Sequence, residues 1–401
     1  MSSRRLVAVD LGTSTVRCAV ADDDGSRLRV LGVGEAPSAG VRKSVIVDPD
    51  AATASISRAL DLAERAAGVE IDSTLMTLGG RHLMSRSRQA VVSVASRSGA
   101  VGTGDLNRVL EAVREAPDLD GTEVVHLIPR SYAVDQMAEL RDPRGVAGTR
   151  LGVDAELVLA STAHLEALVE CAHAAGLRVD DVVAQPLASA EGVVRDRELE
   201  GSVAVVDVGG GTTDIAIFRG GTIKRVLVLP VGGQNVTKDL ATGLHCDLEE
   251  AESVKIRHGH CDPGQIRPEE MVTVVGMGGV GADEVPRRWL AEVIEPRTRE
   301  MVRLIGQVLD QEDGVSRVVL TGGCARLQGF AAAVHQILEM PVRVAVPEGL
   351  FGLADQLGMP EHAATVGLLR WGQRSASGHD HSNQRTTRST GRLNRWLHEL
   401  F

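Results

Sequence analysis

Short runs of aliphatic and β-branched residues lead into glycine-bearing turns at three places in the chain. Residues 6–20 predict a strand, a turn at Gly12 and a second strand, and residues 203–218 repeat this pattern around Gly209–Gly211. A further apolar run at residues 317–321 also ends at a glycine pair. The pattern therefore predicts two β-hairpins and one further strand. The turn within each hairpin and the turn after the further strand have little side-chain bulk.

The segments between these turns alternate between the strand and helix periods. Strands are predicted at residues 28–34, 69–78 and 179–184, and helices at residues 50–67 and 164–175. This alternation is typical of an α/β lobe.

Residues 83–160 depart from the alternation and predict an inserted domain. One strand is expected at residues 88–95 and two more at residues 124–134 and 151–159, with a helix capped by Thr103 before the second strand. The insert is therefore expected to have the order β-α-β-β.

The pattern changes again at the C-terminal end. Residues 373–390 contain almost no apolar side chains, which predicts a flexible linker. Residues 391–401 place five large apolar side chains on one helical face, with Arg392 and Arg395 beside it. This arrangement is typical of a helix lying in the plane of an anionic membrane, and packing of the helix onto the body is the alternative. The predicted membrane-facing residues are Leu393, Trp396, Leu397, Leu400 and Phe401.

Composition excludes several classes of protein. A net charge of −11 and an aromatic content of 2% argue against a nucleic-acid-binding protein. The five cysteines form no disulfide framework, which fits a reducing cytoplasm. The chain has no continuous apolar run of about 18 residues, so no membrane-spanning helix is expected. Two His and Cys pairs between residues 245 and 261 lack the spacing of a zinc site.

The hairpin turns carry the residue types that a phosphate site needs. Glycine lets backbone N–H groups approach an anionic oxygen, and Asp10 and Asp207 stand in matching places before the two turns. Together with Asp214 they are candidate magnesium ligands, acting through water, and Asp207 is also a candidate catalytic carboxylate. The other predicted phosphate-binding residues are Gly12, Thr13, Ser14, Thr15, Gly209, Gly210, Gly211, Thr212 and Thr213. Gly322, Gly323 and Ala325 are expected to lie against a flat base.

In this order the turns resemble the phosphate and adenosine motifs of the superfamily that contains actin, heat-shock chaperones and sugar kinases. The resemblance implies an actin-like two-lobed ATPase fold, in which two ribonuclease-H-like domains bind ATP and Mg²⁺ between them. Residues 248–259 resemble the helix that presents an acid and a lysine to adenosine, here Glu252 and Lys255. Lysine occurs only four times in the chain, which gives Lys255 added weight.

Gln185 and Pro186 resemble the segment called connect 1, in which an acid or glutamine before the proline orients the attacking water. An amide positions a water molecule but cannot take its proton, so slow hydrolysis at best is expected. The alternative is that Gln185 only satisfies backbone groups at a strand end.

The insert narrows the resemblance. Residues 124–135 and 145–151 are similar to subdomain 1C of the FtsA family of bacterial cell-division proteins, and an unrelated insertion is the alternative. The resemblance implies a scaffold that polymerises at the cytoplasmic face of the bacterial membrane and tethers the tubulin-like division protein FtsZ through subdomain 2B. Other division proteins are expected at the insert. Thr15 stands where a lysine is common in this family, so one cation fewer is expected near the phosphates.

The resemblance also implies the domain boundaries and leaves two other functions open. Subdomain 1A is expected at residues 1–82 and 161–195, 1C at 83–160, 2A at 196–235 and 312–362, 2B at 236–311, a final 1A helix at 363–372, the linker at 373–390 and the amphipathic helix at 391–401. The alternatives are a pilus-assembly actin-like protein, against which the amphipathic terminus argues, and a sugar or acyl kinase.

Overall fold

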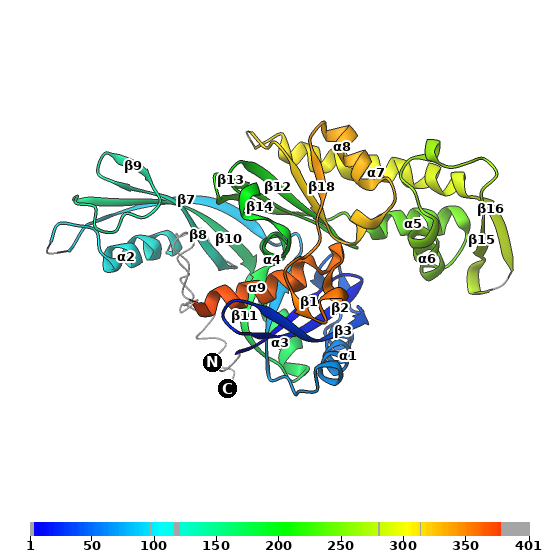
Figure 1. Ribbon diagram of the computed structural model, residues 1–401, viewed down its shortest axis with the longest axis horizontal. Helices are drawn as coiled ribbons and strands as arrows, with labels where there is room; N and C mark the ends of the chain where they lie inside the picture. The colour runs from blue at the N-terminus through cyan, green and yellow to red at the C-terminus, as the bar shows by residue number, and fades with distance from the viewer. Residues whose placement is uncertain (1–3, 97, 116–120, 280, 313, 378–401) are drawn as a thin grey trace.

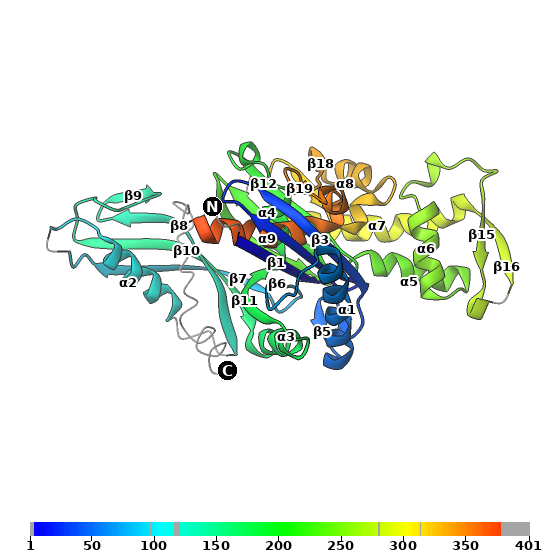
Figure 2. The ribbon, with the colours of Figure 1, turned by 60° about the horizontal axis from the view of Figure 1, so that its bottom comes forward.

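The computed structural model describes residues 4–96, 98–115, 121–279, 281–312 and 314–377. Two central lobes, each built around one β-sheet, lie against each other, and a smaller unit extends from each lobe (Figures 1 and 2). The two smaller units lie at opposite ends of the long axis of the molecule. The predicted membrane helix and residues 378–390 of the predicted linker lie outside the described residues.

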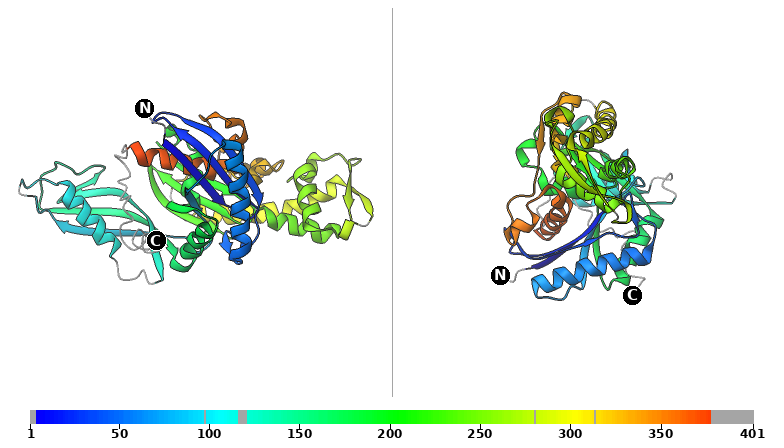
Figure 3. Two further views of the ribbon diagram at one scale, coloured as in Figure 1. Left: turned by 90° about the horizontal axis from the view of Figure 1, so that it is seen from below. Right: turned by 90° about the vertical axis from the view of Figure 1, so that its right-hand side faces the viewer.

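The first lobe contains a six-stranded sheet with the order β11-β6-β1-β2-β3-β19. Its strands are β1 (Arg4–Leu11), β2 (Thr15–Asp23), β3 (Leu28–Pro37), β6 (Ser73–Leu78), β11 (Arg178–Ala184) and β19 (Phe351–Gly352). Helices α1 (Pro49–Ala67) and α3 (Thr162–Ala174) cover one face, and α9 (Ala363–Ser377) covers the other (Figure 3). The hairpin predicted at residues 6–20 is confirmed, because β1 and β2 pair antiparallel.

Local sequence explains why α1 begins and ends where it does. The side chain of Asp48 accepts a hydrogen bond from the N–H of Ala51, and Gly68 ends the helix in the left-handed conformation with φ 67°. Gly32 and Gly34 of β3 allow the helix to approach closely, since a Cβ at Gly34 would lie 2.0 Å from the carbonyl oxygen of Ala59. A short hairpin, β4 (Val41–Arg42) and β5 (Val45–Ile46), precedes the helix.

The second lobe contains a five-stranded sheet with the order β14-β13-β12-β17-β18. Its strands are β12 (Ser202–Val208), β13 (Thr213–Arg219), β14 (Thr222–Leu229), β17 (Val318–Thr321) and β18 (Val342–Val344). Alternate residues of β12 enter different cores, because successive side chains of a strand point to opposite faces. One core packs under α7 (Arg287–Leu309) and α8 (Phe330–Leu338), and the other packs under α4 (Gln185–Val193).

The insert is an antiparallel sheet with the order β7-β10-β8-β9 and one helix packed on it. Its elements are β7 (Met84–Ser93), α2 (Thr103–Arg114), β8 (Thr122–Val134), β9 (Met137–Leu140) and β10 (Arg150–Ser161). Strand β9 was not predicted. The prediction that Thr103 caps α2 is wrong, because Gly102 is the N-cap and its N–H donates to the Asp105 carboxylate at 2.9 Å. The acid three residues into the helix therefore provides the capping interaction that a threonine was expected to provide.

The smaller unit at the other end contains helices α5 and α6, the hairpin β15–β16 and the first part of α7 (Figure 1). The bounds are α5 (Gly233–Leu244), α6 (Leu248–His258), β15 (Met271–Val275) and β16 (Ala282–Pro286). Its first helix begins at Gly233, three residues before the expected start of subdomain 2B, and α7 continues from it into the core of the second lobe.

Two boundaries differ from the prediction. Helix α9 continues to Ser377, so residues 373–377 are helical and do not belong to a linker. Strand β19, predicted to lie in subdomain 2A, pairs with β3 in the sheet of the first lobe. Both differences arise because packing against the first lobe, and not the local sequence pattern, makes these two segments part of that lobe.

Candidate functional site: the pocket between the lobes

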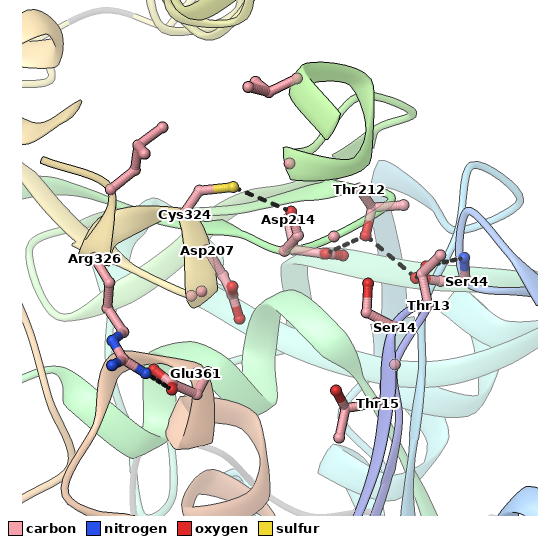
Figure 4. Close-up of a pocket in the computed structure, with 18 of the residues that line it drawn as sticks. Thr13, Ser14, Thr15, Ser44, Asp207, Thr212, Asp214, Cys324, Arg326 and Glu361 are labelled. Carbon is pink, nitrogen blue, oxygen red and sulfur yellow. Dashed lines mark hydrogen bonds and ion pairs between the residues drawn. The ribbon is translucent and has the colours of Figure 1, made fainter. Parts of the chain in front are cut away.

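A pocket of about 310 Å³ is lined by residues of both central lobes (Figure 4). This volume lies at the lower end of the range of roughly 300–1,000 Å³ typical of small-molecule sites. Both hairpin turns reach the pocket, as does the turn after β17. The predicted site residues that line it are Asp10, Gly12, Thr13, Ser14, Thr15, Gln185, Asp207, Gly209, Gly210, Thr212, Asp214, Glu252, Lys255, Gly322 and Gly323.

The two hairpin turns contact each other across the pocket. A Cβ at Gly210 would lie 2.2 Å from Ser14 Oγ and 3.3 Å from Ser14 Cβ, so a side chain at this position would displace Ser14 of the facing turn. Gln234 Nε2 donates to Ser14 Oγ at 3.2 Å and joins the lobes a second time. The turns, 197 residues apart at their aspartates Asp10 and Asp207, therefore form one composite surface.

The role expected of the glycine N–H groups requires a correction. The N–H of Gly12 donates to the carbonyl of Thr15, and the N–H of Gly209 donates to the carbonyl of Thr212, so each closes its own turn. These two N–H groups are therefore already hydrogen-bonded within their own hairpins and are not available to a phosphate. The main contribution of Gly210 is space for the facing turn.

Three buried carboxylates lie at the base of the pocket, and each accepts a hydrogen bond from a hydroxyl group. Thr77 donates to Asp10 at 2.8 Å, Ser189 donates to Asp207, and Thr212 donates to Asp214 at 2.9 Å. Among the described residues, Oδ1 of Asp214 has no hydrogen-bond partner. The Asp214 carboxylate is thus only partly satisfied.

Burial changes the acidity of all three groups. Desolvation raises the pKa of Asp207 to about 6, and the hydrogen bond from Ser189 opposes it. Desolvation and the charge of Asp207 raise the pKa of Asp214 well above its usual range. Desolvation also raises the pKa of Asp10, against the charge of Arg17 and hydrogen bonds from Thr77 and Gln185. A cation at this point would favour the ionised forms.

Arg17 is a pocket residue that the sequence analysis did not identify. It lies opposite Asp10 in the β1–β2 register and lines the pocket. Directly opposed residues of an antiparallel pair project to the same face, and this alternation was the signal that could have found it. Arg17 therefore brings a positive charge to the pocket two residues beyond Thr15, and its Nε lies 3.5 Å from Glu35 Oε1.

Helix α6 forms the other end of the pocket. Lys255 Nζ lies 2.6 Å from Glu252 Oε2 and 2.9 Å from Thr237 Oγ1, and both charged residues line the pocket as predicted. Arg326 forms an ion pair with Glu361 at the edge (Figure 4). The apolar residues that line the pocket are Val236, Ile256, Met301, Leu327 and Phe330.

The turn after β17 brings bare backbone to the pocket, as predicted. Gly322 has φ 86°, and a Cβ there would lie 2.2 Å from Asp207 Oδ1, whereas a Cβ at Gly323 would meet open space. Gly322 thus permits a left-handed turn against the carboxylate. Gly323 leaves the pocket open.

Three predicted residues do not line the pocket. Gly211 packs against Thr13, Thr213 donates its hydroxyl to the carbonyl of Val231 at 2.9 Å, and Ala325 is buried in the 3₁₀ turn Gly323–Arg326. Each sits next to a lining residue in sequence but is not itself among the lining residues. Arg17 and the five apolar residues named above line the pocket without having been predicted, and the same holds for Ser44, Gly233, Cys324, Arg326 and Glu361.

Comparisons with known proteins decide the family. A family model described as "Cell division protein FtsA" matches residues 204–367, and one described as "SHS2 domain inserted in FTSA" matches residues 80–159. The whole chain is 34% identical to the cell division protein FtsA of Pseudomonas aeruginosa and covers 99% of it. This chain belongs to the FtsA family. The FtsA of Escherichia coli K12 is 32% identical over 99% of this chain and 98% of its own length. That of Bacillus subtilis is 32% identical over 92% and 84%.

Membership of the FtsA family confirms that this is a cell-division protein and that the insert is the SHS2 domain of that family. Solved structures confirm the actin-like fold. The "PilM-PilN type IV pilus biogenesis complex" matches with a TM-score of 0.68 at 17% identity, covering 92% of this chain and 98% of that one. MreB 5 of Spiroplasma citri bound to AMPPNP matches with a TM-score of 0.54 at 15% identity, covering 94% and 98%. At these identities the likeness shows the fold alone, so it does not favour the pilus alternative.

Among the residues that the structure describes, no helix of this FtsA-family chain is both long enough and apolar enough to cross a bilayer.

Proposed function

We propose that this FtsA-family protein binds ATP and Mg²⁺ in the pocket between its lobes. The observation that carries the proposal is the meeting of two Asp-Gly hairpins from different lobes at one pocket, with Glu252 and Lys255 at its other end. ATP carries anionic phosphate oxygens that suit the end of the pocket with the hairpins. Its nucleoside suits the end with Glu252 and Lys255. The bound nucleotide would thereby hold both lobes.

The carboxylates suit a magnesium ion held through water. Oδ1 of Asp214 is buried without a partner, and the pKa values of Asp207 and Asp214 are raised by desolvation, so a nearby cation would stabilise both. Within the described ranges, no three His, Cys, Asp or Glu side chains are close enough to hold a metal ion directly. A magnesium ion would therefore contact these carboxylates through its bound water molecules. The ion would neutralise phosphate charge.

Gln185 is proposed to position water rather than to activate it. It is the first residue of α4 and lines the pocket on the same side as Asp10, to which its side chain is hydrogen-bonded. Its amide cannot accept a proton from water. Slow hydrolysis fits a protein that uses ATP mainly as a structural ligand.

Lys255→Met is expected to weaken MgATP binding at least tenfold, because one hydrogen bond to a charged group contributes roughly 1.5–3 kcal/mol and about 1.4 kcal/mol corresponds to a factor of ten. Methionine keeps the unbranched stem of this buried side chain. Isothermal titration calorimetry measures the change, and circular dichroism verifies the fold. Lys238→Met, on the exposed side of neighbouring α5, is the matched control and should bind like the wild type. Equal affinities for all three proteins would contradict the placement of the nucleoside at α6.

We further propose that the ATP-bound protein forms filaments at the cytoplasmic face of the membrane and tethers FtsZ there. Family membership supports a role in cell division. The amphipathic pattern of residues 391–401 supports attachment to lipid, although these residues lie outside the described part of the chain. One such helix binds reversibly, and a filament multiplies the attachment by avidity. Electron microscopy on a lipid monolayer, with and without ATP, tests for the filaments.

Deleting residues 393–401 is expected to release the protein from vesicles that contain anionic lipid while leaving MgATP affinity unchanged. The deletion removes all five apolar side chains of the predicted membrane face. Sedimentation with vesicles measures binding. A double variant, Arg392→Glu and Arg395→Glu, should also reduce binding, and more so at low salt. Sedimentation of the truncated protein at the wild-type level would rule out this helix as the anchor.

The two outer units are the proposed partner surfaces. Subdomain 2B, built on α5, α6 and the β15–β16 hairpin, is proposed to bind the tail peptide of FtsZ, and the SHS2 insert is proposed to bind other division proteins. The SHS2 insert and the β15–β16 hairpin lie at opposite ends of the molecule (Figure 2), whereas the pocket is lined by the central lobes together with α5 and α6. Partners that bind these two ends would leave the pocket uncovered.

A further inference from the structure

Ser44 lies at the phosphate end of the pocket although it comes from neither hairpin. It occupies the turn between β4 and β5, and its N–H donates to Thr13 Oγ1 at 2.9 Å. Its hydroxyl lies 3.4 Å from Thr13 Oγ1 in the same lobe and 3.2 Å from Thr212 Oγ1 in the other lobe (Figure 4). The residue thus bridges the lobes where the two turns meet.

The backbone of this turn is in an unfavourable conformation. Lys43 and Ser44 have φ values of 50° and 58°, so two consecutive residues with side chains adopt the left-handed region. Turns of this kind usually place asparagine and glycine at these positions. Gly79 also packs closely against this turn, since a Cβ at Gly79 would lie 2.9 Å from Ser44 Cβ. Strain that is held in place next to a pocket points to a function for the side chain that it presents.

The direction of the hydrogen bonds shows which proton is available. A threonine hydroxyl has one O–H donor, and Thr212 donates it to Asp214 at 2.9 Å. Thr212 can therefore only accept from Ser44, which makes the Ser44 O–H the donor between the lobes. A phosphate oxygen is a charged acceptor and competes better for this proton than a neutral hydroxyl does.

Position within the pocket indicates which phosphate is involved. Ser44 lies on the opposite side of the pocket from Cys324 and Arg326, which belong to the base-binding end (Figure 4). A nucleotide that extends from that end brings its last phosphate nearest to Ser44. A diphosphate has one phosphate fewer toward this end of the pocket.

We infer that Ser44 is a binding residue for the terminal phosphate and distinguishes ATP from ADP. This inference rests on the proposed nucleotide function. When ATP binds, the Ser44 hydroxyl donates to the terminal phosphate instead of to Thr212. The hydrogen bond between the lobes is thereby exchanged for one that depends on the third phosphate.

The test measures the affinities of wild type and Ser44→Ala for the non-hydrolysable analogue AMPPNP and for ADP, both with magnesium, by calorimetry. Ser44→Ala is expected to weaken AMPPNP binding about tenfold and ADP binding less than about twofold. Ser44→Gly should show the same loss of discrimination and should unfold at a higher temperature, because glycine relieves the left-handed strain. Ser26→Ala, at an exposed serine remote from the pocket, is the control and should match the wild type.

The outcomes separate the two proposals. If Ser44→Ala binds both nucleotides like the wild type, or loses affinity for both equally, the role of Ser44 is refuted while the ATP site stands. If the wild type binds neither nucleotide, the proposed function fails and this inference fails with it.

Discussion

Replacing Asp207 with Asn is expected to make the protein more stable at pH 8 and to abolish magnesium-dependent binding of ATP. Asp207 is 7% exposed, and desolvation raises the pKa of its carboxyl to about 6. At pH 8 the folded protein therefore holds a buried negative charge beside Asp10 and Asp214. Asparagine has nearly the same shape, still accepts the hydrogen bond from Ser189, and carries no charge.

The sign of the pH dependence follows from the direction of the pKa shift. The pKa is higher in the folded protein than in the unfolded chain, where it is about 3.8. The folded form consequently binds the proton more tightly between these values, and the free energy of unfolding decreases as pH rises through about 6. Asp207→Asn has no titrating group at this position, so its free energy of unfolding does not decrease for this reason. Its stability relative to the wild type should grow from about pH 4 and level off above pH 6, at about 2–3 kcal/mol.

Urea unfolding at a series of pH values measures this difference, and calorimetry with and without EDTA measures the magnesium dependence of ATP binding. Asp61→Asn, at an exposed position of α1, is the control for loss of one negative charge and should leave both properties unchanged. A variant that is less stable than the wild type at pH 8, or that keeps magnesium-dependent binding, would show that Asp207 is not held for the cation.

Gly367→Ala is expected to lower the free energy of unfolding by about 3 kcal/mol. Gly367 lies where α9 crosses α4, and a Cβ there would lie 1.7 Å from the carbonyl oxygen of Ala188. Gly192 makes the reciprocal approach, with a Cβ position 2.0 Å from the carbonyl oxygen of Ala363. Since both obstacles are backbone atoms, neither can rotate away, and the helices must separate. This crossing joins α9, which packs on the sheet of the first lobe, to α4, which packs on the sheet of the second. The substitution should therefore destabilise both lobes.

The same substitution at a different glycine provides the control. Gly104 lies in α2 with open space around its Cβ position and an ordinary helical conformation. Gly104→Ala should be neutral or stabilise by up to about 1 kcal/mol, because alanine has the higher helix propensity. Urea unfolding compares the two variants. A Gly367→Ala protein as stable as Gly104→Ala would mean that the two helices are not in close contact.

Features that depend on neighbouring residues were predictable from the chain alone. Both hairpins were located because each consists of two apolar runs around a glycine-bearing turn, and Asp10 and Asp207 occupy the same place in each. The α6 pair Glu252 and Lys255 was identified from its resemblance to the superfamily's adenosine-presenting helix, and the structure places the two side chains, three residues apart, in one ion pair. The insert was recognised by its break with the surrounding alternation, although β9 was missed because Met137–Leu140 is too short to show a strand pattern.

Features that depend on distant segments were not predictable in this way. Arg17 faces the carboxylates only through the register of β1 and β2, and Ser44 reaches Thr212 across 168 positions of sequence. Gly367 appears in the sequence as an ordinary helix glycine, yet the crossing with α4 makes it indispensable.

The sequence by itself determined the two Asp- and glycine-bearing hairpins, the insert and the amphipathic pattern of residues 391–401, because these are encoded by local spacing and residue type. Only the tertiary structure decided which side chains meet in the pocket, how strongly burial shifts the acidity of Asp207, and where backbone contact forbids a Cβ. Those properties depend on desolvation and close packing, which arise when segments far apart in the chain are brought together.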